Sequence, residues 1–134
     1  MPGGGFAVAI TDDLGDGNSH GIRVRFYAAA GVPAGNDVQV NTEIAANQGL
    51  PSIAAIEPSG AAGGLAAGGV IVVWSSPTSG TAGDGSSNGV FGQLLGTDGT
   101  PIGGEFLINT TTTNSQFDPA VAGLQGGRFV VVWE

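Results

Sequence analysis

The sequence has no cysteine and no lysine, and its basic side chains are three arginines and one histidine. Without cysteine the chain can form no disulfide, thiolate metal site or thiol nucleophile. Eleven acidic residues against three arginines give a formal net charge of −8. This balance argues against binding to nucleic-acid phosphates or anionic membrane surfaces, which need a basic face. It is compatible with a cationic partner, of which calcium is the first candidate.

Long apolar runs are also missing from the 134 residues. No stretch approaches the roughly 20 residues that span a bilayer, so we expect no membrane insertion. Residues 1–5 lack the basic and apolar regions of a signal peptide. We therefore expect that, if the chain is exported, its export signal belongs to a larger protein.

Glycine is abundant instead, at 26 of 134 residues, against a usual share of about 7%. Glycine loses more backbone entropy on folding than any other residue, so this content argues against long helices and fits many tight turns. Apolar residues make up 41% of the chain, which is ample for a buried core.

An internal repeat organises the sequence, because residues 16–56 match residues 84–124 without a gap when the chain is shifted by 68 positions. Turn residues and apolar residues match together, which indicates one repeated structural unit. The clearest identities join these pairs: Asp16 and Asp84, Gly31 and Gly99, Pro33 and Pro101, Asn41 and Asn109, Gln48 and Gln116, Pro51 and Pro119.

A glycine pair followed by an apolar run occurs three times, at residues 4–10, 68–74 and 126–133. A short, continuously apolar, β-branched run predicts a strand buried on both faces. These landmarks divide a single all-β region, residues 1–134, into a first repeat of about 1–59, a second of about 60–125, and the start of a third at 126–134.

Each repeat carries four strand signals, and the chain about nine. After each glycine-pair run and a polar loop, we expect strands at 22–27 and 90–95, then at 38–42 and 105–110, then at 52–56 and 120–124. Asp98 and Gly99 mark a hairpin turn between two of them. Four-stranded antiparallel repeats predict an all-β fold of β-propeller-like blades. A β-sandwich and a stacked-hairpin β-solenoid would carry the same local signals.

The second copy resembles a known family of repeats. Residues 126–134 resemble a "G-G-F-V-V-V-W-E" segment, residues 97–109 a "D-G-x-P-x-G-x-E-F-x-V-N" segment, and residues 118–122 "D-P-x-V-A". Together these are similar to the tandem repeats of large RTX-type (hemolysin-type calcium-binding) secreted and surface proteins of bacteria. The resemblance implies an exported, often adhesin-like parent protein. The first copy departs from it, with Ile10 for the tryptophan, Ala30 for the turn aspartate and Leu50 for the aspartate before proline.

Polar loops supply the candidate metal ligands. Calcium takes several oxygen ligands from a flexible, glycine-containing loop. The candidates are the residues of the densest acidic cluster and one aspartate of the equivalent loop in the second copy: Asp12, Asp13, Asp16, Asn18 and Asp84. The same residues would also serve a solvated turn. The nonapeptide calcium roll of RTX proteins (G-G-x-G-x-D) is absent from the sequence.

No catalytic set stands out. His20 is the only histidine and lies in a polar loop position, and no G-x-S-x-G nucleophile motif is present. Trp74 and Trp133 end their apolar runs, where aromatic residues usually anchor a core, although they could also stack on sugars. An enzyme such as a propeller-type glycosidase would need converging acids that the sequence does not provide.

The sequence therefore predicts a non-enzymatic structural or adhesive repeat module of a larger exported protein, located extracellularly or at the cell surface and acting in assembly or display. We expect self-assembly through open sheet edges or neighbouring repeats. The alternative is a calcium- or glycan-binding module that uses the Asp/Gly/Asn-rich loops.

Overall fold

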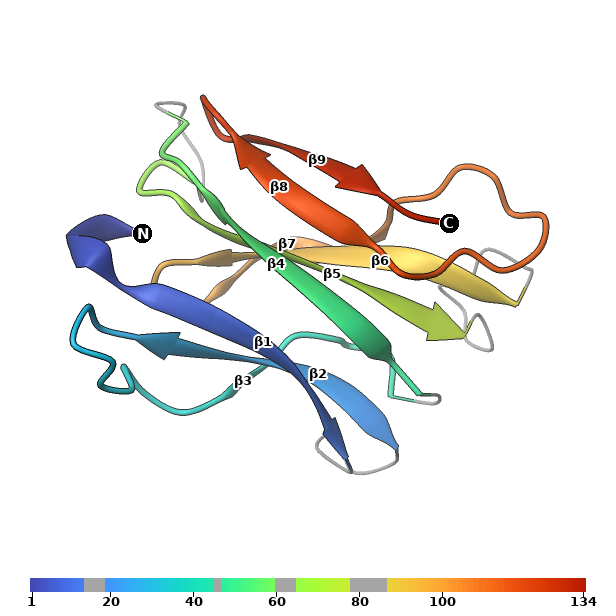
Figure 1. Cartoon of the computed structure of the whole chain (residues 1–134), viewed down its shortest axis with the longest axis horizontal. Coiled ribbons are helices and arrows are strands. Elements are labelled where there is room, and N and C mark those ends of the chain that lie inside the picture. Colours follow the sequence, from blue (N-terminus) through green and yellow to red (C-terminus); the bar gives the residue numbers. More distant parts are fainter. Residues whose placement is uncertain (14–18, 45–46, 60–64, 78–86) are drawn as a thin grey trace.

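The computed structural model describes residues 1–13, 19–44, 47–59, 65–77 and 87–134 (Figure 1). Within these ranges a short 3-10 turn, η1 (Pro2–Gly4), precedes nine strands, which confirms the all-β prediction. The strands are β1 (Phe6–Asp13), β2 (His20–Tyr27), β3 (Val38–Gln39), β4 (Gly49–Ile56), β5 (Gly69–Pro77), β6 (Asn88–Gly96), β7 (Pro101–Leu107), β8 (Ala120–Leu124) and β9 (Arg128–Val132). The described part of the chain holds no helix of the length and apolar character that crossing a membrane requires.

The strands form three antiparallel sheets, each in simple chain order. Sheet A has the order β1-β2-β3, sheet B the order β4-β5-β6-β7, and sheet C the order β8-β9. Sheet B is a complete four-stranded meander. In it β4, which precedes the predicted repeat boundary near residue 59, pairs with β5, which follows that boundary. Among the described residues the sheets close into neither a barrel nor a ring.

The predicted strands at 38–42 and 105–110 have C-terminal ends that lie too late in the sequence, since β3 ends at Gln39 and β7 ends at Leu107. The reason is a change of hydrogen-bonding partner. The Val40 N–H still donates to the Ile22 carbonyl at 2.9 Å, but the Ile22 N–H then donates to the side chain of Asn41 at 2.7 Å. A side-chain oxygen has replaced the backbone carbonyl that a regular antiparallel ladder would use.

The hairpin turn predicted at Asp98 and Gly99 is present in both copies. In the second copy the Gly96 N–H donates to Thr100 O at 2.8 Å, and in the first the Ala28 N–H donates to Val32 O at 2.9 Å. The absence of aspartate in the first copy does not abolish the turn. The glycine at the end of each turn has positive φ, +76° at Gly31 and +83° at Gly99, a conformation that glycine adopts at no steric cost.

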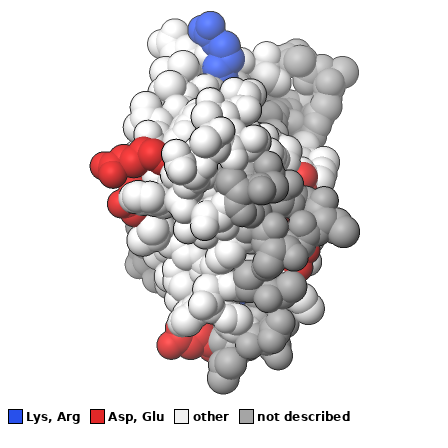
Figure 2. Space-filling view, turned by 90° about the vertical axis from the view of Figure 1, so that its right-hand side faces the viewer, with Lys and Arg blue, Asp and Glu red and all other residues white. Residues whose placement is uncertain are grey.

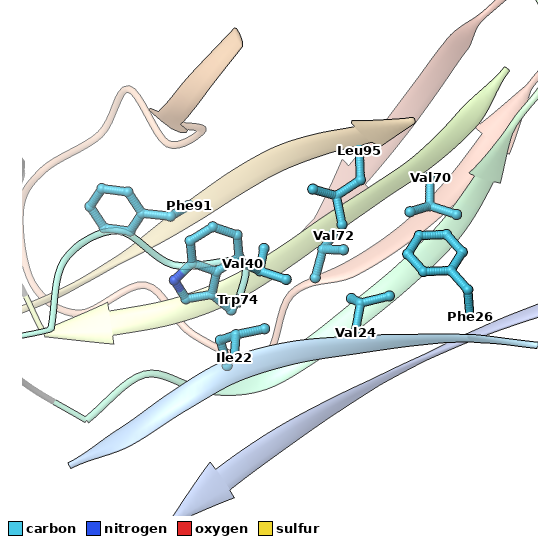
Figure 3. Close-up of a cluster of buried hydrophobic side chains, with 9 residues drawn as sticks. All are labelled: Ile22, Val24, Phe26, Val40, Val70, Val72, Trp74, Phe91 and Leu95. Atoms are coloured by element: carbon cyan, nitrogen blue, oxygen red, sulfur yellow. The ribbon is translucent and has the colours of Figure 1, made fainter. Parts of the chain in front are cut away.

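Sheet B lies between the other two sheets and supplies both halves of the core. Val70, Val72 and Trp74 of β5 belong to a cluster with residues of sheet A, which Figure 3 shows. Ile71 and Val73, the alternate residues of β5, pack instead with residues of sheet C. Side chains that alternate between two covered faces explain why this strand is apolar at every position from Val70 to Trp74. The nine buried members of the first cluster are Ile22, Val24, Phe26, Val40, Val70, Val72, Trp74, Phe91 and Leu95.

The first strands of the three sheets also lie side by side. β4 lies next to both β1 and β8 (Figure 1). A Cβ atom at Gly123 of β8 would lie 2.1 Å from the carbonyl oxygen of Ala55 on β4, so only glycine permits this distance. The Val121 N–H donates across the same gap to Ser52 Oγ at 3.2 Å. Sheets B and C are thus joined by a polar contact as well as by their apolar faces.

Candidate functional site

A buried polar cluster recurs in both repeats and holds the segment that leads from one sheet to the next. In the second repeat, Asn109 Oδ1 accepts a hydrogen bond from the Val90 N–H at 2.8 Å. Its Nδ2 donates to Thr111 O at 2.9 Å and to Gln116 Oε1 at 3.1 Å. The Gln116 Nε2 donates in turn to the carbonyl oxygens of Thr113 and Asn114 at 3.1 and 3.0 Å. Two side chains therefore satisfy the backbone of a connection that has no strand of its own.

The first repeat reproduces the hydrogen bonds that the asparagine of this cluster makes. Asn41 accepts from the Ile22 N–H at 2.7 Å and donates to Glu43 O at 2.8 Å and to Gln48 Oε1 at 3.1 Å. The Gln48 N–H donates to His20 O at 3.0 Å, as the Gln116 N–H does to Asn88 O at 2.9 Å. The hydrogen bonds between these asparagine and glutamine side chains, and those of the glutamine N–H, therefore recur at the 68-residue interval, while the counterparts of Thr113 and Asn114, residues 45 and 46, lie outside the described residues.

Sequence reasoning matched these Asn and Gln pairs between the copies but did not predict that they bind each other. The available signal was that these polar residues recur at equivalent positions of the two copies, among apolar and turn residues that also recur. All four side chains are almost fully buried, and a buried polar group is costly unless it is hydrogen-bonded. The repetition of Asn and Gln seven residues apart was therefore the signal from which a polar cluster could have been predicted.

The acidic residues at the end of β1 point to different partners. Asp12 Oδ2 lies 2.8 Å from Arg23 Nε, and Asp13 Oδ1 lies 2.8 Å from His20 Nε2. Successive side chains of a strand project from opposite faces of the sheet, so these two carboxylates do not converge on one point. Each is instead paired across the β1–β2 hairpin.

The other predicted calcium ligands, Asp16, Asn18 and Asp84, lie outside the described residues. In the described ranges no three side chains of His, Cys, Asp or Glu come together in a way that could hold a metal ion. Calcium binding by these loops stays a prediction.

His20 occupies both of its ring nitrogens. Nε2 contacts Asp13, and Nδ1 lies 2.7 Å from Asn47 Oδ1, which also accepts a hydrogen bond from Ser19 Oγ. A serine nucleophile would need a histidine nitrogen free to take its proton. The geometry of His20 is that of a cross-link between β1, β2 and the segment before β4.

The two tryptophans differ in burial. Trp74 is fully buried and stacks on Phe91, with ring centroids 6.5 Å apart, as predicted for a packing anchor. Trp133 is 39% exposed, although it follows the equivalent strand of sheet C. The difference arises because the side chain of Trp74 is enclosed between sheets A and B, and no described strand pairs with the outer edge of β9.

Charged residues of β2 and β7 link neighbouring segments. Arg25 binds Asp37 through Nε and through Nη2, the second contact at 2.9 Å. Hydrogen bonding to Asp37 and its charge raise the pKa of the Arg25 guanidinium. Glu105, the counterpart of Asp37, instead accepts hydrogen bonds from the backbone and hydroxyl of Thr42 at 2.8 and 3.0 Å. Glu105 thereby connects sheet B to the segment that leaves sheet A.

A hollow of about 500 Å³ lies where β4 and β8 end. It is lined mainly by apolar surface, and Glu57 is the one carboxylate among the described residues that line it. Glycoside hydrolysis by the usual mechanism needs two carboxylates that flank the bond, so this hollow lacks that arrangement. Figure 2 shows a face on which uncharged residues predominate and acidic residues lie near its margins.

No protein-family model matches this sequence, and searches of curated proteins and of solved structures also find no match.

Proposed function

We propose that the chain is a non-enzymatic structural repeat module, built to stack against further copies of the same unit in an exported, adhesin-like protein. Its resemblance to the tandem repeats of RTX-type secreted and surface proteins supports an extracellular or cell-surface location. We also propose that the complete unit is the four-stranded, blade-like meander that sheet B exemplifies.

The observation that carries this proposal is the repetition of the buried Asn–Gln cluster at a 68-residue interval. Asn41 with Gln48, and Asn109 with Gln116, hold the connection that leads from one sheet to the next. A device that is repeated at both connections between sheets serves the joining of sheets rather than a single active centre. The apolar interfaces on both faces of sheet B also support a role in joining sheets, because each unit buries its faces only against neighbouring units.

The side chains nearest to a catalytic arrangement support the non-enzymatic part of the proposal. His20 is engaged at both nitrogens, Asp12 is paired with Arg23, and the hollow at the end of β4 and β8 offers a single described carboxylate. His20 and Asp12 are used in cross-links between strands, which is what a structural module requires.

A bead-clustering assay tests the proposal. Beads coated with the whole chain are mixed in buffer that contains a calcium chelator, and albumin-coated beads serve as the control. A structural assembly module should cluster its own beads in the chelator. Clustering that requires calcium, or that free glycans abolish, would replace the proposal with the calcium- or glycan-binding alternative. Beads that never cluster would refute the role in assembly.

A further inference from the structure

Two exposed apolar surfaces lie at opposite ends of the stack of sheets. The leading face is formed by three residues of β1, Phe6, Val8 and Ile10, which are 45, 39 and 39% exposed. The trailing face is formed by Leu124 of β8 and by Val130 and Val132 of β9, which are 44, 46 and 61% exposed.

The strand registers show what these surfaces correspond to inside the chain. Val8 pairs with Arg25 on β2, and Val72 pairs with Gln93 on β6. Gln93 lies 68 positions after Arg25 and is its equivalent in the repeat, so Val72 is the equivalent of Val8. By the same register, Phe6 and Ile10 correspond to Val70 and Trp74. The leading face of sheet A is therefore the equivalent of the β5 surface that sheet A itself covers.

The trailing face has an equivalent on the opposite side of sheet B. Ala122 pairs with Val130 as Ala54 pairs with Ile71, and Ala120 pairs with Val132 as Ser52 pairs with Val73. Ile71 and Val73 are fully buried, and they pack against sheet C. The trailing face is thus the equivalent of a surface that the next sheet covers.

We propose that the chain associates with a second copy of itself head to tail, with the trailing face of one copy covering the leading face of the other. The contact would continue, between two chains, the stacking that joins sheet A to sheet B and sheet B to sheet C. It rests on the repeat function proposed above and adds the surfaces that carry the assembly.

The surroundings of the leading face fit a two-stranded partner such as the β8–β9 ribbon. On β2, beside the leading face, Arg23 and Arg25 occupy the positions that Phe91 and Gln93 occupy in sheet B. Both arginines are bound to aspartates, and Tyr27 stacks on Phe6 with ring centroids 4.8 Å apart. A ribbon that covers β1 leaves the charged strand β2 at the margin, as in interfaces with an apolar centre and a polar rim.

Head-to-tail contacts are heterologous, because two different surfaces meet, so they form open chains or rings. The test exploits this property with two variants at exposed positions, Val8→Lys on the leading face and Val132→Lys on the trailing face. Val32→Lys, in the exposed loop between β2 and β3, is the matched control. Sedimentation velocity is measured over a concentration series that reaches about 500 µM, because a contact centred on three apolar side chains from each face should be weak.

We expect wild type and Val32→Lys to self-associate, and each face variant alone to remain a monomer. An equimolar mixture of Val8→Lys and Val132→Lys should give a 1:1 dimer and nothing larger, because one intact leading face and one intact trailing face remain. Circular dichroism of each variant checks that the sheets are retained.

Other outcomes overturn the head-to-tail contact. If Val8→Lys alone still dimerises, the trailing faces pair with each other. If both face variants associate like wild type, open sheet edges carry the assembly, and the structural function proposed above survives without this contact. A wild-type chain that stays monomeric throughout, together with beads that do not cluster, would refute both proposals.

Discussion

The buried Asn–Gln cluster makes a quantitative prediction for the substitution Asn109→Ala. The change removes the acceptor of the Val90 N–H and the donor to Gln116 Oε1. Val90 and Gln116 are both buried, so these two groups lose their partners away from water. Thr111, the remaining partner, is exposed, and water can replace the lost hydrogen bond there.

Each buried group left without a partner costs about 1–3 kcal/mol. Two such groups give a loss of about 2–6 kcal/mol in the free energy of unfolding, and we expect about 3 kcal/mol because the cluster borders an exposed loop. For a domain whose total stability is about 5–15 kcal/mol, this is a large fraction. Asn41→Ala should cost a similar amount, because the Ile22 N–H and Gln48 Oε1 lose the same partners. Gln39 Nε2, which also donates to Asn41, belongs to a partly buried residue, so water can replace that bond.

Urea unfolding followed by tryptophan fluorescence measures the effect. With an m-value of about 2 kcal/mol per molar urea, the midpoint should fall by about 1.5 M for either variant. Asn36→Ala, at an exposed asparagine, is the control and should change stability by about 0.5 kcal/mol or less. If Asn109→Ala shifts the midpoint no more than Asn36→Ala does, the cluster does not stabilise the fold, and the reasoning is wrong.

Two further predictions concern single contacts. Gly123→Ala places a Cβ 2.1 Å from Ala55 O, so it should lower the free energy of unfolding in urea by about 1–3 kcal/mol. Gly104→Ala, where a Cβ would meet no atom within 4 Å, is the control and should change that free energy little. Equal effects would contradict the close approach of β4 and β8. The Thr100 N–H donates to Asp98 at 2.9 Å and lowers the pKa of that carboxyl. Its stabilisation is therefore complete above the unfolded pKa of about 3.9 and is lost as pH falls through the lower folded pKa. The melting temperature of the wild type should exceed that of Asp98→Asn near neutral pH, and the difference should shrink in acid. A difference that does not depend on pH would be inconsistent with the role of Asp98.

The sequence by itself determined the local elements, because strands and turns depend on the periodicity of apolar residues and on the residue types that turns require. The three apolar runs after glycine pairs predicted strands covered on both faces. The structure confirms this for β5, but the prediction is wrong for β1 and β9, which each have one exposed face. Asp98 and Gly99 predicted the hairpin between β6 and β7. The offset of 68 residues predicted that β2 and β6 would be equivalent strands, and their registers agree.

The lengths of β3 and β7 could not be read from the sequence in the same way. Both predicted strands continue through residues that are apolar or β-branched and suit a strand, such as Val40 and Ile108. The side chains of Asn41 and Asn109 take over the next hydrogen bond of the ladder. A side chain that replaces a backbone carbonyl leaves no trace in hydrophobic periodicity.

The tertiary structure alone decided which neighbours the functional candidates would meet. Asp12 and Asp13 are adjacent in sequence, yet pleating sends one to Arg23 and the other to His20. Trp74 and Trp133 end similar apolar runs, yet only the first is enclosed between two sheets. Composition and spacing fix what a strand can bury, but the stacking of sheets, which depends on contacts distant in sequence, fixes which of its faces is covered and which remains free to bind another copy.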